Sequence, residues 1–254
     1  MTTDETRPVA IVTGAGRGIG RAIAAALVDD GYRPVVVDLD GEAAEGTARR
    51  LGERGAHDPL AFQADVRSFE RARVVIGEVL AQFGRVDALV NNAGISQPKA
   101  FVELTEDDWD RTIDVHLKGS FNWSHAVAPG MLARGAGRIV CISSVNAKTG
   151  GAFPAVSKTA YAAAKAGMLG LVRGLARELA PGVTVNAVCP GLIATELTQS
   201  MWAGPRGAEA IAAIPAGRVG QPEDIADVVA FLLSPKASYI TGEVVDVNGG
   251  FYVD

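Results

Sequence analysis

Residues 9–20 carry the sequence VAIVTGAGRGIG, in which a cluster of glycines lies directly between an apolar, β-branched run and an alanine-rich stretch typical of a helix. Glycine lets a backbone approach a diphosphate closely, and the N-terminus of the following helix supplies N–H donors and the positive end of its dipole. The spacing is Gly14-x-x-x-Gly18-x-Gly20, because Ile19 stands where the stricter G-x-G-x-x-G pattern needs glycine. An ordinary tight turn uses glycine in the same way, so this stretch alone leaves both interpretations open.

Apolar, β-branched runs alternate with helical periodicity along the rest of the chain. The expected strands are residues 9–12, 35–39, 60–64, 88–90, 138–142, 183–188 and 243–247. Helical patterns lie between them, for example behind the candidate N-caps Ser68 and Thr105 and behind Pro222. This alternation predicts an α/β protein: one doubly wound Rossmann domain over residues 1–254, with a mostly or wholly parallel seven-stranded sheet. Residues 192–220 break the pattern with prolines and glycines, and we expect a substrate lid there.

The composition excludes several classes of protein. The 254 residues are 48% hydrophobic and 21% charged, which is typical of a globular chain, and a formal charge of −5 argues against a nucleic-acid partner. No apolar run reaches the roughly 18 residues that cross a bilayer, and the polar start of the chain does not resemble a secretory signal. Cys141 and Cys189 form no C-x-x-C pair, and the three histidines lack metal-ligand spacing. We therefore expect a cytoplasmic protein without a membrane partner or a metal site.

Asp38 closes the second expected strand and bears on the choice of ligand. A carboxylate at this position accepts hydrogen bonds from an adenosine ribose and repels a 2′-phosphate. Arg17 favours the opposite choice, because a cation near the ribose can hold that phosphate. The position of Asp38 is fixed by its strand, whereas the long Arg17 side chain can swing away. The sequence therefore favours NAD over NADP.

Polar residues also follow the later strands, where doubly wound sheets bind their ligands. Asp65-Val66 follows the third strand and Asn92 the fourth, and their side chains can bind an adenine or stabilise loop backbone; the sequence leaves both readings open. Ser144 closes the fifth strand. Tyr161 and Lys165 are spaced i, i+4 at the start of a helix, so both side chains share one face. An ammonium beside a phenol, with an oxidised nicotinamide nearby, favours the phenolate form.

In this order and at these spacings, the motifs resemble those of the short-chain dehydrogenases/reductases from Val9 to Tyr252. The matching stretches are Thr13-Gly14-x3-Gly18-x-Gly20, Asp65-Val66, Asn91-Asn92-Ala93-Gly94, Ser144, Tyr161-x3-Lys165, Pro190-Gly191 and Asn248-Gly249-Gly250. The resemblance implies that Tyr161 is the general acid/base, that Ser144 holds the substrate oxygen, and that Lys165 binds the nicotinamide ribose and lowers the pKa of the tyrosine. It implies hydride transfer between the nicotinamide and a carbinol carbon.

The full set of candidate residues combines the motifs with this resemblance. The catalytic candidates are Ser144, Tyr161, Lys165 and His116; the cofactor-binding candidates are Gly14, Arg17, Gly18, Ile19, Gly20, Asp38, Asp65, Val66, Asn92, Ala93, Gly94, Tyr161, Lys165, Pro190, Gly191, Ile193 and Thr195. His116 stands where many family members have an asparagine that holds a relay water. Imidazole also donates and accepts hydrogen bonds and shuttles protons near neutral pH, so we predict that His116 keeps this relay, against the alternative that it merely packs in its helix.

A second departure is the segment between Ser144 and Tyr161, which is longer than in many family members. It carries Lys148 and Lys158, which either guide an anionic substrate or are ordinary solvated charges. Ser157 is a rival for the role of Ser144 but lies too close to Tyr161 to share the strand-edge geometry. In the expected lid, Met201 and Trp202 are candidates for walls of the substrate pocket, or for core or oligomer contacts.

These observations predict an NAD(H)-dependent oxidoreductase that interconverts a secondary alcohol and a ketone, with Tyr161 as general acid/base. An NADPH-dependent 3-oxoacyl-type ketoreductase shares nearly every motif and stays the main alternative. A non-catalytic NAD(H)-binding regulator is a remote alternative, because a sensor has no need for the phenol–ammonium pair. The resemblance further implies a homo-oligomer, a tetramer formed through helices near residues 109–133 and 162–180. A small-molecule alcohol or ketone is the expected partner, and its identity does not follow from the sequence.

Overall fold

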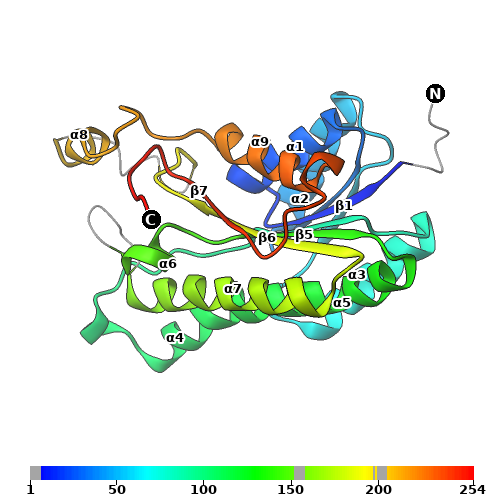
Figure 1. Ribbon diagram of the computed structural model, residues 1–254, viewed down its shortest axis with the longest axis horizontal. Helices are drawn as coiled ribbons and strands as arrows, with labels where there is room; N and C mark the ends of the chain where they lie inside the picture. The colour runs from blue at the N-terminus through cyan, green and yellow to red at the C-terminus, as the bar shows by residue number, and fades with distance from the viewer. Residues whose placement is uncertain (1–6, 152–157, 197, 199–204) are drawn as a thin grey trace.

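A computed structural model describes residues 7–151, 158–196, 198 and 205–254, and it shows a three-layer arrangement of helices around one sheet (Figure 1). The seven strands have the order β3-β2-β1-β4-β5-β6-β7, and every neighbouring pair is parallel. Their bounds are β1 Val9–Thr13, β2 Arg33–Asp38, β3 Leu60–Gln63, β4 Ala88–Asn91, β5 Gly137–Ile142, β6 Val183–Pro190 and β7 Val244–Val247. The predicted doubly wound, wholly parallel Rossmann sheet is confirmed.

The helices divide between the two faces of the sheet (Figure 1). Their bounds are α1 Gly18–Asp29, α2 Gly41–Glu53, α3 Phe69–Phe83, α4 Glu106–Ile113, α5 Gly119–Arg134, α6 Asn146–Thr149, α7 Thr159–Glu178, α8 Pro205–Ala212 and α9 Pro222–Leu233. Helices α1, α2 and α9 contribute to one core cluster, and α3, α5 and α7 contribute to the other. A π-helical turn, Asp114–Lys118, joins α4 to α5.

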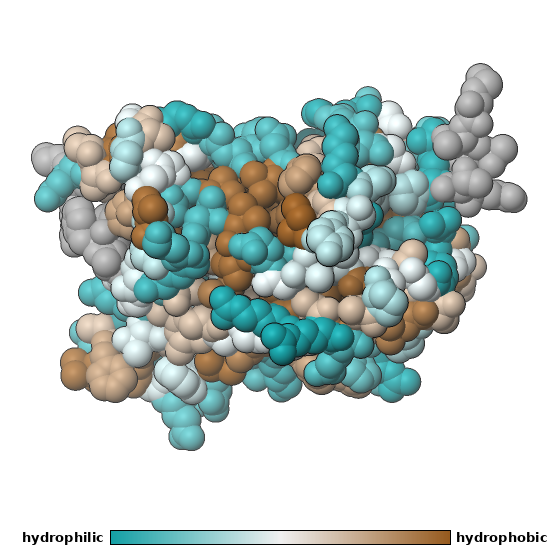
Figure 2. All heavy atoms as spheres, viewed as in Figure 1, coloured by the Kyte–Doolittle hydropathy of each residue, from teal (hydrophilic) through white to brown (hydrophobic). Residues whose placement is uncertain are grey.

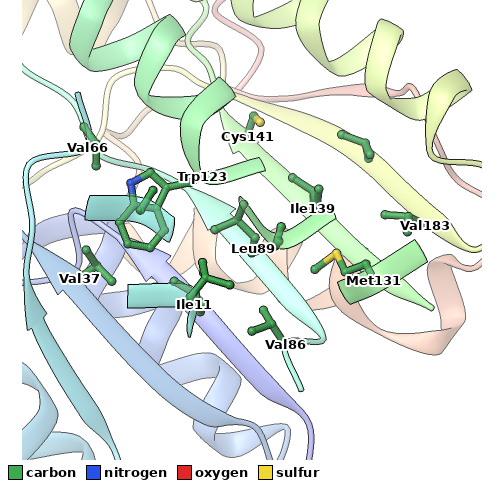
Figure 3. Close-up of a cluster of buried hydrophobic side chains, with 14 of the residues drawn as sticks. Ile11, Val37, Val66, Val86, Leu89, Trp123, Met131, Ile139, Cys141 and Val183 are labelled. Carbon is green, nitrogen blue, oxygen red and sulfur yellow. The ribbon is translucent and has the colours of Figure 1, made fainter. Parts of the chain in front are cut away.

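Both cores are built on side chains that alternate along the central strands. Val9 and Ile11 of β1 face the α3–α5–α7 core, while Ala10 and Val12 face the other core. A strand that is buried on both faces needs apolar residues at every position, which is why it is a continuous apolar run in the sequence. Trp123 is the largest fully buried side chain, and it lies over the sheet near Ile11 in Figure 3.

The helix starts follow the capping signals in the sequence. The Ser68 hydroxyl accepts a hydrogen bond of 3.1 Å from the N–H of Arg71 at the start of α3. At α4, Thr105 and Asp108 form a reciprocal capping box, with N–H to side-chain distances of 3.2 and 3.1 Å. The predicted caps of α3 and α4 are therefore confirmed. Because these caps satisfy otherwise orphaned N–H groups, they fix where each helix leaves its loop.

The strand order places the ligand-binding edge. Strand β1 lies between β2 and β4, so the chain leaves β1 toward one side of the sheet and later returns to its other side. Loops at the carboxyl ends of β1 and β4 therefore diverge and leave a crevice between them. Every other strand also ends at this edge, since the sheet is wholly parallel.

Truncation of Leu89, in the middle of β4, tests how much the buried core contributes to stability. Its side chain is 0% exposed, so Leu89→Ala should lower the free energy of unfolding by about 2–5 kcal/mol through lost burial and a cavity. Chemical denaturation at one fixed protein concentration measures this loss. Val102→Ala is the control, because Val102 is 90% exposed and its truncation should cost far less. Equal losses in the two variants would contradict this placement of the core.

Candidate active site

A cavity of about 450 Å³ lies at the carboxyl edge of the sheet. All the catalytic and cofactor-binding candidates from the sequence line it: Gly14, Arg17, Gly18, Ile19, Gly20, Asp38, Asp65, Val66, Asn92, Ala93, Gly94, His116, Ser144, Tyr161, Lys165, Pro190, Gly191, Ile193 and Thr195. They come from segments far apart in the chain, and the shared strand direction brings them together. The structure thus places the whole set in one site.

The glycine loop after β1 fits a diphosphate by shape and by charge. Gly14 and Gly18 have φ angles of 63° and 54°, which residues with a side chain rarely adopt. A side chain at Gly20 would collide with the Gly14 carbonyl and the Asn92 amide. Helix α1 begins at Gly18 and has no acidic residue in its first turn. The Glu196 carboxylate, from the segment after β6, accepts a hydrogen bond from the Gly18 N–H and pairs with Arg21, so it would have to give way to a bound diphosphate. The loop therefore has the backbone shape and the helix dipole of a dinucleotide site.

Asn92 supports this loop. Its side-chain amide donates to the carbonyls of Thr13 and Gly14, both at 3.0 Å. Its own backbone N–H donates to the Thr13 hydroxyl, also at 3.0 Å. Of the two readings that the sequence left open for Asn92, the structure shows the one in which the side chain stabilises loop backbone.

The carboxylate of Asp38 is fixed at the edge of the cavity. One oxygen accepts the Gly16 N–H at 2.8 Å, and the other accepts the Asp40 N–H at 3.1 Å. A Cβ at Gly16 would lie 2.9 Å from the Asp38 oxygen, so only glycine permits this approach. Asp40, by contrast, caps α2 by accepting the Ala43 N–H at 3.1 Å. The Arg17 side chain is exposed beside the loop.

Asp65 has a partner that the sequence did not indicate. The guanidinium of Arg67 lies 2.6 Å from its carboxylate, and this hydrogen bond lowers the pKa of Asp65. Arg67 and Arg111 both line the cavity next to Asp65 and Val66. Arg67 was within reach of sequence reasoning, because it follows Asp65 by two residues. Arg111 was not, because only the packing of α4 brings it to this edge.

Ser144, Tyr161 and Lys165 form the polar centre of the cavity. Lys165 is 3% exposed, and its ammonium donates to the Ile142 carbonyl at 2.6 Å, so burial lowers its pKa from 10.5 to about 8. The ammonium also lies 5.6 Å from the centre of the Tyr161 ring. Burial raises the pKa of Tyr161, and a hydrogen bond with Ser144 opposes this shift. The protein by itself therefore gives Tyr161 a raised pKa. The lowering by Lys165 stays a prediction for the enzyme with its nicotinamide cofactor bound.

His116 lies in the π-helical turn, 1% exposed, with its ring edge against the Tyr161 ring at 5.0 Å between centres. Its Nε2 is 3.0 Å from the Ile95 carbonyl and 3.2 Å from the Ile95 N–H. Burial and the charge of Lys165 hold the pKa of His116 well below 6.5. The imidazole is therefore neutral at pH 7, and any relay through it uses the neutral ring as donor and acceptor.

Lys148 is paired inside the chain. Its ammonium is bound to the carboxylates of Asp246 and Asp254, at 2.6 and 2.7 Å, and its side chain is only 12% exposed. Neither of the two readings left open for Lys148, a substrate guide or a solvated charge, describes this paired ammonium. Lys158 is exposed just before α7. Ser157, Met201 and Trp202 lie outside the described residues.

Other cavity residues had no signal in the sequence. Asn146 and Phe251 line the same cavity as Ser144, and Glu196 lines it near Gly18. Glu196 also forms an ion pair with Arg21 of α1 at 2.6 Å. Phe251 lies more than a hundred positions from Ser144 in the chain. Such residues reach one cavity only because all the parallel strands end at the same edge of the sheet.

Known proteins match both the sequence and this architecture. A family model described as "Enoyl-(Acyl carrier protein) reductase" matches residues 14–252. The chain is 43% identical to the 3-oxoacyl-[acyl-carrier-protein] reductase FabG of Staphylococcus aureus, over 96% of this chain and 98% of that protein. It is 44% identical to the (3R)-3-hydroxyacyl-CoA dehydrogenase of Mus musculus, over 96% of each. The crystal structure of gox2181 superposes with a TM-score of 0.92 at 38% identity, covering 96% of this chain and 95% of that one.

The chain belongs to the short-chain dehydrogenase/reductase family. It is an oxidoreductase that acts on CH–OH groups, interconverting a secondary alcohol and a ketone with a nicotinamide cofactor. In the part of the chain that the structure describes, no helix is both long and apolar enough to cross a bilayer. The same residues contain no group of three or more histidine, cysteine or carboxylate side chains that could hold a metal ion.

The depressed pKa of His116 makes stability depend on pH. Below about pH 6.5 the unfolded chain binds a proton at this histidine while the folded chain does not, so stability is lost as the pH falls. Between pH 7 and pH 5 this one group should account for at most about 2 kcal/mol of the loss. His116→Asn should flatten that part of the curve, measured by denaturation at several pH values. A wild-type slope in His116→Asn would contradict the burial of a neutral His116.

Proposed function

We propose that this enzyme is an NAD(H)-dependent oxidoreductase that interconverts 3-hydroxyacyl and 3-oxoacyl thioesters. The position of Asp38 carries the choice of cofactor. Its carboxylate is held at the cavity edge by the Gly16 N–H at 2.8 Å, where it would accept ribose hydroxyls and repel a 2′-phosphate. The names of the two relatives support the substrate class, since one is a 3-oxoacyl reductase and the other a 3-hydroxyacyl dehydrogenase.

In this proposal, Tyr161 exchanges a proton with the oxygen of the substrate, and the Ser144 hydroxyl holds that oxygen. The hydrogen bond between Ser144 and Tyr161 supports a shared position for the oxygen between them. The nicotinamide ring, when bound, supplies or accepts the hydride. Lys165 would bind the nicotinamide ribose, and its ammonium would favour the phenolate of Tyr161. With a pKa of about 8, Lys165 is mostly protonated at pH 7 and has this charge available.

The rest of the cavity divides between the parts of the dinucleotide. The loop Gly14–Gly20 and the N-terminus of α1 would hold the diphosphate. Asp65 and Val66 would lie against the adenine, and Asn92, Ala93 and Gly94 would form the floor of the cofactor-binding cavity. Pro190 ends β6, and Gly191, Ile193 and Thr195 follow it; these four residues would border the nicotinamide carboxamide. Residues 192–220 would form the substrate lid, and the bridge between Ile193 and Gly220 supports this by tying its two ends together.

His116 is the proposed relay residue. Its ring touches Tyr161 and its Nε2 meets the backbone of Ile95, so a neutral imidazole there can pass a proton by donating and accepting in turn. His116→Ala should therefore lower activity and change its pH profile. Full activity with an unchanged profile would leave His116 as a packing residue only.

The assembly and compartment complete the proposal. Trp109, Phe121 and Leu132 on α4 and α5 are 40–48% exposed, which supports a homotetramer formed through these helices and α7. On α7, Ala163 and Gly170 face outward, whereas Gly167 packs inward on Leu117. A further apolar group lies between α9 and the β6–β7 edge (Figure 2) and offers a second face for association. The free thiols Cys141 and Cys189 fit a reducing compartment, the cytoplasm.

Loss of the phenol is the direct test of the reaction. The wild-type enzyme should reduce 3-oxoacyl thioesters with NADH, and Tyr161→Phe should lower kcat by at least about a hundredfold, since a positioned acid/base contributes about 10²–10⁴. Absorbance of NADH reports the rate, and fluorescence titration of NADH should show binding kept in the variant. Binding without turnover of any thioester, simple ketone or polyol by the wild type would favour the non-catalytic regulator.

The cofactor preference has its own test. The ratio of kcat/KM for NADH over NADPH should exceed about ten in the wild type, because repulsion at the Asp38 carboxylate costs at least about 1.4 kcal/mol. Asp38→Ser should lower this ratio by removing the charge. Asp40→Ser is the matched control, as it removes the neighbouring carboxylate that caps α2. A wild-type preference for NADPH would instead identify the NADPH-dependent 3-oxoacyl ketoreductase.

A further inference from the structure

The ammonium of Lys148 joins two distant segments beside the active site. It comes from Lys148 of α6, four residues after Ser144, and lies 2.6 Å from Asp246 of β7 and 2.7 Å from Asp254. It also lies 5.4 Å from the centre of the Tyr252 ring. The four side chains of Lys148, Asp246, Tyr252 and Asp254 are called the tail clamp below.

The charges of the tail clamp stabilise one another, as the pKa shifts of its members show. Two carboxylates raise the pKa of Lys148 despite the opposing effect of burial, and its side chain is 12% exposed. The charge of Lys148 in turn lowers the pKa of Asp254. A hydrogen bond to Asp254 raises the pKa of Tyr252, so the tyrosine hydroxyl is a donor to the same carboxylate. The Lys148 and Asp246 side chains are only 12% and 21% exposed, so their pair is less screened than a surface pair. The Asp254 side chain is 66% exposed, so its arm of the clamp is the weaker one.

Between its two carboxylates, the chain makes a tight, internally bonded turn. The Asn248 side chain accepts the Gly250 N–H at 2.9 Å and donates to the Tyr252 carbonyl at 3.0 Å. The Gly249 carbonyl accepts the Ala216 N–H at 2.9 Å. The turn is thus held from within by Asn248, and the tail clamp fixes the segment on either side of it, at Asp246 and Asp254, to α6.

Phe251 is the residue that this turn presents to the active-site cavity, which it lines together with Ser144 and Asn146. It follows β7, the edge strand of the sheet, whereas Asp38 ends β2, next to the opposite edge. Phe251 therefore borders the half of the cavity away from the adenosine, where the substrate would lie. An aromatic ring there supplies an apolar wall.

We propose that Phe251 is a specificity-determining wall of the substrate pocket and that Lys148, through the tail clamp, is the residue that positions it. The inference rests on the proposed function, since it assigns this wall to the thioester's acyl chain. Lys148 thus influences the substrate without touching it. The charge of Lys148 holds the C-terminal segment in place, and the Phe251 ring in that segment contacts the acyl chain of the substrate.

The test uses Phe251→Ala, Asp254→Asn and the double variant, each in the full-length enzyme. Asp254→Asn weakens the tail arm of the clamp and leaves the Lys148–Asp246 pair intact. Phe251→Ala should raise KM for a medium-chain 3-oxoacyl thioester about tenfold and change kcat less than about twofold, because an apolar contact to the bound substrate is lost. Asp254→Asn should raise KM in the same direction, by about threefold.

The double variant decides whether the two residues act together. If Asp254 acts through Phe251, adding Asp254→Asn to Phe251→Ala should change KM no further. Independent, multiplying effects on KM would overturn the proposal, as would unchanged KM in Phe251→Ala. Glu243→Gln, which removes an exposed carboxylate just before β7, is the matched control and should leave KM unchanged.

Hydrogen exchange gives a readout that needs no substrate. Lys148→Met and Asp254→Asn should speed exchange at the amides of residues 250–254, while Lys236→Met, at an exposed lysine, should not. Unchanged exchange would show that the clamp does not hold the tail and would overturn the positioning role. Failure of the wild type to turn over any thioester would overturn the proposed function and the wall, and the exchange data would then still decide the clamp separately.

Discussion

The parallel pairing of all seven strands is the constraint on which the rest of the structure depends. Parallel strands must be joined by crossovers, so helices cover both faces and the central strands are buried. The same pairing sends each strand's carboxyl end to one edge of the sheet. Loops that are far apart in sequence, such as those at Gly14, Ser144 and Phe251, therefore line one cavity. The active-site residues meet in one cavity because all seven strands run in the same direction.

Burial shapes the charges within this cavity. Lys165 is almost fully buried and keeps its position through the Ile142 carbonyl, at the cost of a pKa lowered to about 8. The charge of Lys165 and the surrounding protein then hold His116 neutral. Tyr161 lies between these groups, and Ser144 opposes the effect of burial on its phenol. A dry, preorganised site of this kind makes each remaining charge more effective than it would be in water.

Lys148 shows how the same residue type acquires a different role from its neighbours. In sequence it borders the expected substrate loop, and a solvated lysine there would attract anionic substrates. In the fold, β7 brings Asp246 beneath it and the following turn brings Asp254 alongside. Its charge is then neutralised locally, and its influence on the substrate becomes an indirect one through Phe251. The change follows from pairing across the sheet edge, which spacing along the chain does not report.

The sequence by itself determined the class of fold, the strands to within a few residues, the caps at Ser68 and Thr105, and the candidate residues of the cavity. These features depend on local signals: apolar runs, capping side chains, and glycines where a backbone must come close. Only the tertiary structure decided that Asn92 supports the loop, that His116 is buried and neutral, and that Lys148 is paired with Asp246. Each of these outcomes depends on contacts between residues distant in the chain, because burial and charge pairing are properties of the packed molecule and not of its local sequence.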